Sequence, residues 1–317
     1  MESKYSEPKK RLLEKCFKGE LELRSQPARI PRRPAGERAP LSHGQQQVWL
    51  HAQMAPEVPV YNEPVTIHYS GELNVAALEK AFNAVLLRHE AWRTSIQVIE
   101  GKPCQQVHEN LTVSIPFTDL RELPAEQREA EAVALATADA KIPIDFRTAP
   151  LFRVRLVQLA EKEYRLYLTL CHIIFDGVAL YRVFLPELVA LYNEFALGKS
   201  AHLPDLAFQY PDYACWQREN YAREQFAKDV EFWRARLSAG FPERYLPTDR
   251  PHPSRQSFRG SMFPFTLNAR LTTNIRQYCR TEGTSIFQVL LAAFGALLNR
   301  YSAEDRIQSE ASRRVAT

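Results

Sequence analysis

Long apolar runs are absent from this sequence. No stretch of about 18 uncharged apolar residues occurs, which argues against a membrane-spanning helix. The opening residues, MESKYSEPKKRLLEKCF, lack the apolar core of a secretion signal. Charge of one sign is also scarce, because 41 Lys and Arg against 37 Asp and Glu leave a net charge of +4. We therefore expect a cytoplasmic protein with neither membrane nor nucleic acid as its partner.

Cysteine is scarce and scattered. The five cysteines, at positions 16, 104, 171, 215 and 279, form no CxxC pair. This spacing predicts reduced thiols and no zinc site, so we expect no bound metal. Internal repeats and low-complexity tracts are absent as well. What remains is ordinary globular composition, 45% hydrophobic and 25% charged over 317 residues, enough for about two domains.

Hydrophobic periodicity along the chain predicts a mixed α/β fold. Helices are expected over 7–23, 75–90, 124–141, 178–197, 209–238 and 285–302. Strands are expected at 65–73, within 92–108 on both sides of a Gly-Lys-Pro turn, as a pair within 151–174, and at 261–271. Asn74 is the expected N-cap of the helix that follows it. Residues 25–40, rich in Pro and Arg, predict an extended linker with solvated charges.

Potentially reactive side chains stand where an apolar strand ends, in YRLYLTLCHIIFDG, residues 164–177. Successive strand residues face opposite sides of a sheet, so Cys171 and His172 should point apart. That geometry argues against a Cys-His nucleophilic dyad. His172 is the better candidate for chemistry, since a neutral imidazole accepts a proton near neutral pH. Asp176 could contact His172, pair with an arginine, or cap the next helix while His172 merely packs.

Several segments together resemble the condensation domains of nonribosomal peptide synthetases, relatives of chloramphenicol acetyltransferase. CHIIFDG is similar to their His-His-x-x-x-Asp-Gly motif. LSHGQQQVWL (41–50), RHEAWRTSI (88–96) and YPDYACWQ (210–217) resemble three further motifs of the family, in the family's order. LPTDRP and SFRG also match, and the N-terminal segment is similar to the linker that precedes such domains. The resemblance extends from residue 8 to about 306.

The resemblance implies a role for each matching residue. His172 falls on the catalytic histidine of the family. Asp176 falls on an aspartate that is mainly structural and is salt-bridged to an arginine, here Arg88, with Arg93 as the second choice. Gly177 would give the backbone room beside the substrate channel. Cys171 replaces the family's first histidine, and we expect activity to survive because it should face the core.

The resemblance also implies a chloramphenicol acetyltransferase-like fold with two lobes. We expect an N-terminal helix and linker at 1–35, a complete first lobe at 36–200 that carries the active-site motif, and a partial second lobe at 201–317. After NRYSAED the family enters an apolar strand, whereas RIQSEASRRVAT is polar. A truncated or frame-changed second lobe is therefore expected. Such a lobe would expose apolar surface, including the face of 285–298.

Three functions remain open at this point. The first is amide-bond formation between acyl or peptidyl and aminoacyl thioesters. Its partners would be carrier proteins and neighbouring synthetase domains, whose phosphopantetheine arms bring the substrates, and no cofactor would be bound. The second is an inactive remnant that serves at most as an interaction module for carrier proteins. The third is an acyltransferase that uses coenzyme A thioesters.

Overall fold

The computed structural model describes residues 30–34, 36–221, 224–238, 248–251, 258–261 and 263–302. The chain divides into two compact units, Arg29–Arg223 and a second made of Met1–Ala28 and Glu224–Thr317. The boundary between the units lies beyond residue 200, where the sequence placed the end of the first lobe. The helix predicted at 7–23 lies outside the described residues.

The unit Arg29–Arg223 contains two β-sheets and the helices that cover them. Its elements are β1 (Ala39–Pro40), α2 (His43–Met54), β2 (Asn62–Ser70), α3 (Val75–Arg88), η1 (Glu90–Arg93), β3 (Thr94–Ile99), β4 (Lys102–Val107), β5 (Phe117–Asp119), α4 (Ala125–Lys141), β6 (Phe152–Ala160), β7 (Glu163–Cys171), η2 (Ala179–Phe184), α5 (Leu185–Ala196) and α6 (Tyr210–Tyr221). The larger sheet has the order β2-β7-β6-β5 and the smaller has the order β1-β4-β3. Only the β5–β6 pairing is parallel among the pairings described. This is the mixed α/β architecture that the sequence predicted.

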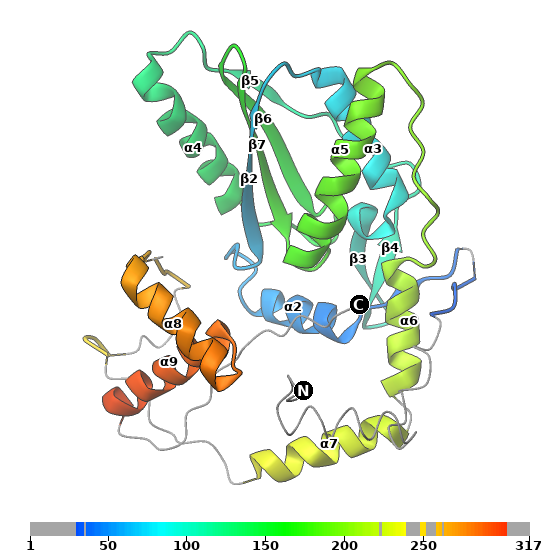
Figure 1. The fold of residues 1–317 in the computed structure, drawn as a ribbon. Helices are drawn as coiled ribbons and strands as arrows, with labels where there is room; N and C mark the ends of the chain where they lie inside the picture. The colour runs from blue at the N-terminus through cyan, green and yellow to red at the C-terminus, as the bar shows by residue number, and fades with distance from the viewer. Residues whose placement is uncertain are drawn as a thin grey trace, which may run out of the picture. The chain divides into compact units, whose positions relative to one another are not determined.

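Helices cover both faces of the larger sheet (Figure 1). Helices α3 and α5 pack side by side on one face, and α4 lies on the other. Phe82 of α3, Phe152 of β6 and Phe184 of η2 meet in the core, with the ring centroids of Phe82 and Phe184 5.5 Å apart. Asn74 caps α3 as predicted, because its side chain accepts the Ala77 N–H at 3.0 Å. Burial of large aromatic side chains fixes how helix and sheet meet.

Strand β7 carries the candidate motif to one end of the larger sheet. It pairs with β2 along its whole length, from Glu163 opposite Ser70 to Cys171 opposite Asn62, and with β6 on its other side. A strand with neighbours on both sides is held extended, so its last residue is placed firmly. The chain leaves the sheet at His172, and α2 lies at this end of the sheet (Figure 1).

Two expectations about local structure need correction. Residues 263–268, part of the strand predicted at 261–271, have no regular structure, and no strand pairs with them in the described part of the chain. Alternation alone does not make a strand that lacks a neighbour. The helix predicted at 178–197 contains a π-helical segment, η2, before α5. The helix predicted at 209–238 is found as α6 and α7 (Glu224–Leu237), and residues 222–223 between them lie outside the described residues.

The second unit contributes α7, α8 (Ala269–Glu282) and α9 (Ile286–Ser302) to the described residues. Gly283 ends α8 in the left-handed conformation, with φ of 63°. No residue of α9 is buried, and Phe287 and Phe294 are 58% and 50% exposed. The exposed apolar face predicted at 285–298 is thus confirmed. Among the described helices none is long and apolar enough to span a membrane alone; α8 and α9 meet the criterion only as a pair bent by 107°.

Candidate active site

His172 is the first residue after β7, and its side chain is exposed. Its backbone N–H donates to the Tyr61 carbonyl at 2.9 Å, which ties the residue to the start of β2. The next three side chains, Ile173, Ile174 and Phe175, are buried at 3%, 7% and 8% exposure. These apolar side chains anchor the turn in the core while the imidazole faces outward. We define residues 172–175 as the histidine turn.

The neutral ring of His172 is held in one tautomer. Nδ1 lies 2.9 Å from the Phe175 carbonyl oxygen. A carbonyl oxygen can only accept a hydrogen bond, so Nδ1 must carry the proton. The lone pair of the neutral ring is then on Nε2, the nitrogen that can take a proton from an attacking group. The ring also lies against Phe175, with centroids 5.4 Å apart. This tautomer is the one that a general base requires.

Cys171 points into the core, as alternation along β7 predicted. It has 0% exposure and belongs to the main apolar cluster. Burial raises the pKa of its thiol to about 12. A thiol so protected is a packing group and a poor nucleophile. The prediction that Cys171 and His172 point apart is confirmed.

We expect alkylation to leave Cys171 intact in the folded chain. With a pKa of about 12, roughly one Cys171 thiol in 10⁴ is ionised at pH 8. Cys104 and Cys215 are only partly buried and should react first. Iodoacetamide labelling at pH 8, followed by peptide mass spectrometry, checks the order. Modification of Cys171 as fast as Cys104 would contradict its burial, whereas labelling in denaturant should reach all of them.

Asp176 caps the helix that follows the histidine turn. Its carboxylate accepts the Ala179 N–H at 2.7 Å, and its backbone carbonyl accepts the Leu180 N–H at 3.0 Å. The side chain is exposed. Of the roles considered for this residue, helix capping is the one that the structure shows. Negative charge at the first turn also suits the helix dipole.

The arginine partner predicted for Asp176 is wrong. Arg88 binds Glu187 instead, with Nε 3.2 Å from both carboxylate oxygens. Arg88 ends α3 and Glu187 lies in the first turn of α5; because these two helices pack together, their charged ends meet. Arg93, the second choice, donates to the His108 carbonyl at 3.1 Å and lies 4.0 Å from Glu90. Both arginines make contacts within the unit Arg29–Arg223, and neither contacts Asp176 in any described interaction.

Gly177 shows no steric need for glycine within the described chain. A methyl group placed on it would meet no atom within 4 Å, and its φ lies outside the left-handed region. The sequence had predicted that glycine makes room here; the space beside it is empty of protein, and its use by a substrate stays a prediction. Gly101, in the β3–β4 turn, differs because its φ is 74°.

Gly177→Ala should therefore leave folding intact or stabilise it by about 0.4–1 kcal/mol, since alanine restricts the unfolded chain. Gly101→Ala is the matched control and should cost about 1–2 kcal/mol, because alanine is strained at positive φ. Urea unfolding followed by circular dichroism measures both. A loss of stability in Gly177→Ala as large as in Gly101→Ala would show that the glycine is required by the fold itself.

One contact between the motifs was missed by the sequence interpretation. Arg33, assigned to a solvated linker, is a largely buried member of an ion-pair network, with 12% of its side chain exposed. Its Nη1 lies 2.7 Å from Asp212 and its Nη2 lies 2.6 Å from Glu90. Asp212 comes from YPDYACWQ and Glu90 from RHEAWRTSI, so one arginine joins two of the motifs. An arginine followed by proline and two acids far away in the sequence form no local sequence pattern that would have revealed the contact.

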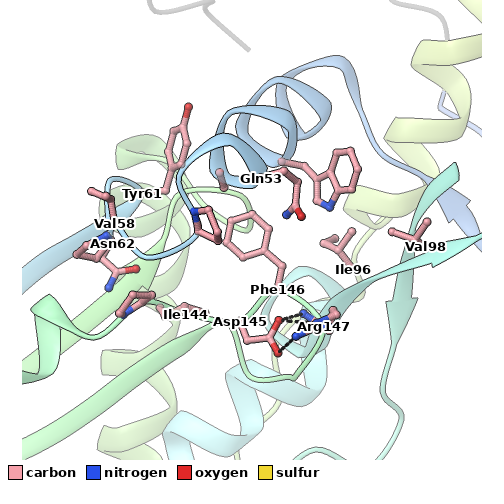
Figure 2. Close-up of a pocket in the computed structure, with 15 residues that line it drawn as sticks. Gln53, Val58, Tyr61, Asn62, Ile96, Val98, Ile144, Asp145, Phe146 and Arg147 are labelled. Atoms are coloured by element: carbon pink, nitrogen blue, oxygen red, sulfur yellow. Dashed lines mark hydrogen bonds and ion pairs between the residues drawn. The ribbon is translucent and has the colours of Figure 1, made fainter. Parts of the chain in front are cut away.

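A cavity of about 630 Å³ lies next to the histidine turn, and its lining includes Tyr61, whose carbonyl accepts the His172 N–H, and Asn62. Its walls come from α2, the segment before β2, β3 and residues 143–147. In Figure 2, Phe146 lies in the middle of the cavity lining, with Tyr61 on one side of it and Ile96 on the other. At its edge Arg147 binds Asp145 at 3.0 Å, and this hydrogen bond lowers the pKa of the Asp145 carboxyl. The volume is in the range of small-molecule sites.

The candidate site is thus an exposed imidazole, with Nδ1 bonded to the Phe175 carbonyl, at the end of a sheet in a mixed α/β unit. Comparison with known proteins gives the family. The family model described as Condensation domain matches residues 36–315. A linear gramicidin synthase protein of Brevibacillus parabrevis is 38% identical over 291 residues, covering 92% of this chain and 4% of that protein. Phosphinothricin tripeptide synthetase PhsC of Streptomyces viridochromogenes is 36% identical, covering 87% of this chain and 25% of that protein.

Solved structures agree. The X-domain in the complex of X-domain and OxyB from teicoplanin biosynthesis has a TM-score of 0.76 and 28% identity, covering 88% of this chain and 60% of that one. The chain belongs to the condensation-domain family of nonribosomal peptide synthetases, and its fold is the chloramphenicol acetyltransferase-like fold of that family. It spans a small part of the curated relatives named above, which are synthetases of secondary metabolism.

Proposed function

We propose that this chain catalyses amide-bond formation between an acyl or peptidyl thioester and an aminoacyl thioester, each carried on the phosphopantetheine arm of a partner carrier protein. The observation that carries the proposal is the geometry of His172: exposed, with Nδ1 committed to the Phe175 carbonyl at 2.9 Å. Nε2 is then the nitrogen available to an incoming amine. The match of the family over residues 36–315 supports the reaction class.

In the proposed reaction the acceptor amine attacks the thioester carbonyl of the donor. A C–N bond forms, the C–S bond breaks, and the donor arm leaves as a thiol. Nε2 of His172 orients the amine, takes its proton, and returns a proton to the leaving sulfur. Holding the two thioesters together lowers the entropic barrier, and the cavity beside Tyr61 and Asn62 offers space for part of a substrate. The residues need no bound cofactor for this chemistry.

The test uses the 317-residue chain with two carrier proteins. One carries an N-acylated aminoacyl thioester and the other carries each of a panel of aminoacyl thioesters. Mass spectrometry of the acceptor carrier protein should show a mass gain equal to the donor acyl group, above a reaction that lacks the chain. Parallel reactions with free coenzyme A thioesters, without carrier proteins, distinguish the proposed reaction from that of a coenzyme A-dependent acyltransferase. Product from coenzyme A thioesters alone would replace the proposal, and no product with any load would overturn it for this chain.

A second candidate function is a docking module. The X-domain with a TM-score of 0.76 to this chain is found in a complex with OxyB. By analogy this chain would bind a carrier protein or a partner enzyme without catalysing amide formation. Isothermal titration with carrier proteins measures it: binding without turnover favours the module, and turnover that depends on His172 favours the enzyme.

A further inference from the structure

Gln45, in the first turn of α2, has an almost fully buried side chain with 4% exposure. Its Oε1 accepts the Ser42 N–H at 3.1 Å. Its Nε2 donates to the Ile173 carbonyl at 3.2 Å and to Oε1 of Gln105 at 3.3 Å. The amide oxygen and both N–H groups are thus used. The orientation of the amide is unambiguous, because an N–H can only donate and a carbonyl can only accept.

The bond to Ile173 reaches the middle of the histidine turn. Two main-chain hydrogen bonds also hold the turn. The His172 N–H donates to the Tyr61 carbonyl at 2.9 Å, and the Ile174 N–H donates to the Cys171 carbonyl at 3.1 Å. Gln45 adds a side-chain hydrogen bond that comes from α2 and not from β2 or β7. Through this tether the Ile173–Ile174 peptide, one residue beyond His172, is fixed to α2.

The tether continues into the second sheet. Gln105 of β4 donates its own Nε2 to the Pro40 carbonyl of β1 at 2.8 Å. On the other side, Ser42 Oγ lies 2.8 Å from the hydroxyl of Tyr210 in α6. Burial raises the pKa of Tyr210, and the charge of Asp176 adds to that rise. A buried, satisfied network of this kind holds one arrangement in a low-dielectric interior.

Helix capping alone does not explain Gln45. Ser42 and Gln45 form a capping box, and that box uses only Oε1 of the glutamine. Glutamate caps equally well in this motif. A glutamate here would turn an oxygen toward two acceptors, the Ile173 carbonyl and Gln105. The two N–H groups of the Gln45 amide therefore make hydrogen bonds, to Ile173 and Gln105, that helix capping does not require.

We propose that Gln45 is a positioning residue for His172: its Nε2 holds the histidine turn in the form in which Nδ1 donates to Phe175 and Nε2 of the imidazole is free. The expected effect on the rate of amide formation rests on the proposed function. The expected effect on the position and tautomer of His172 rests on the geometry alone.

The experiment compares Gln45→Glu, which keeps the cap and loses the donors, with Gln47→Glu on the exposed side of the same helix. Gln45→Glu should lower kcat by about 10–100-fold, because moving the His172 imidazole by about 1 Å is enough to slow the reaction by that much. KM for both carrier proteins should stay within about twofold. Long-range ¹⁵N–¹H spectra of the imidazole should show Nδ1 protonated in the unaltered chain and a tautomer mixture in Gln45→Glu. Gln47→Glu should change neither.

The proposal is overturned if Gln45→Glu folds with unchanged kcat and an unchanged His172 spectrum. Gln45→Met, which buries no charge, gives the same comparison where Gln45→Glu does not fold. In the unaltered chain, the Gln45 amide protons should exchange with solvent about a hundredfold more slowly than those of Gln47, and equal rates would also overturn it. If the unaltered chain makes no product, the proposed function fails, while the imidazole spectra still decide the role of Gln45.

Discussion

Replacing His172 with alanine is expected to lower the rate of amide formation by about 10²–10⁴-fold, the range that a positioned proton acceptor contributes. Nδ1 of the ring is bonded to Phe175 at 2.9 Å, and Nε2 has no hydrogen-bond partner among the described residues, so Nε2 is the reactive group that the substitution removes. Folding should be nearly unaffected. The side chain is exposed, and the lost hydrogen bond contributes about 1 kcal/mol.

His172→Gln separates positioning from proton transfer. A glutamine amide can reach the place of Nε2 and orient an amine, but it cannot take a proton. If orientation carries most of the effect, His172→Gln recovers most of the rate; if proton transfer carries it, His172→Gln is as slow as His172→Ala. His68→Ala, at an exposed position of β2 in the same sheet, is the matched control and should keep the parent rate within about twofold. Equal rates for His172→Ala and the parent would remove His172 from the chemistry.

Alternation along β7 was enough to predict that Cys171 faces the core and His172 faces away. The prediction works because β7 is paired on both sides, which leaves a strand little freedom to twist out of register. The pairing of Arg88 could not be predicted in this way. Its partner Glu187 is 99 residues away, and the two meet only because α3 lies along α5. The resemblance to the family implied that Asp176 would be the partner of Arg88, but the packing of α3 against α5 brings Glu187 to that arginine instead.

Local chemistry explains the elements that were missed. Helix α2 carries a Ser42-x-x-Gln45 capping box, a signal that a search for helix starts would have found. The alternating residues 261–271 show the opposite error: the pattern is present, but Phe263 and Phe265 stay 86% and 78% exposed. A strand forms when a neighbouring strand takes up its hydrogen bonds, and periodicity does not supply that neighbour.

The second large effect is expected at Arg33, where Arg33→Met should destabilise the unit Arg29–Arg223 by about 3–5 kcal/mol. The arginine side chain is 12% exposed, and the partner carboxylates of Asp212 and Glu90 are 2% and 18% exposed. Removing the cation leaves two largely buried negative charges whose desolvation is no longer offset. Urea unfolding measured by tryptophan fluorescence should show the loss, and the melting temperature should fall by roughly 10 °C.

Arg32→Met is the matched control, because it makes the same substitution one residue earlier. The Arg32 side chain is 52% exposed, lies 4.0 Å from Asp212 and donates to the Leu206 and Ala207 carbonyls, so its removal should cost about 1–2 kcal/mol, less than that of Arg33. Adding Asp212→Asn to Arg33→Met removes one stranded charge, and the double variant should be more stable than the sum of the single losses by about 0.5–3 kcal/mol. Strict additivity would mean that the two side chains do not interact. A loss in Arg33→Met no larger than in Arg32→Met would mean that residues 30–34 rest on the unit without stabilising it, as the solvated linker predicted from the sequence would.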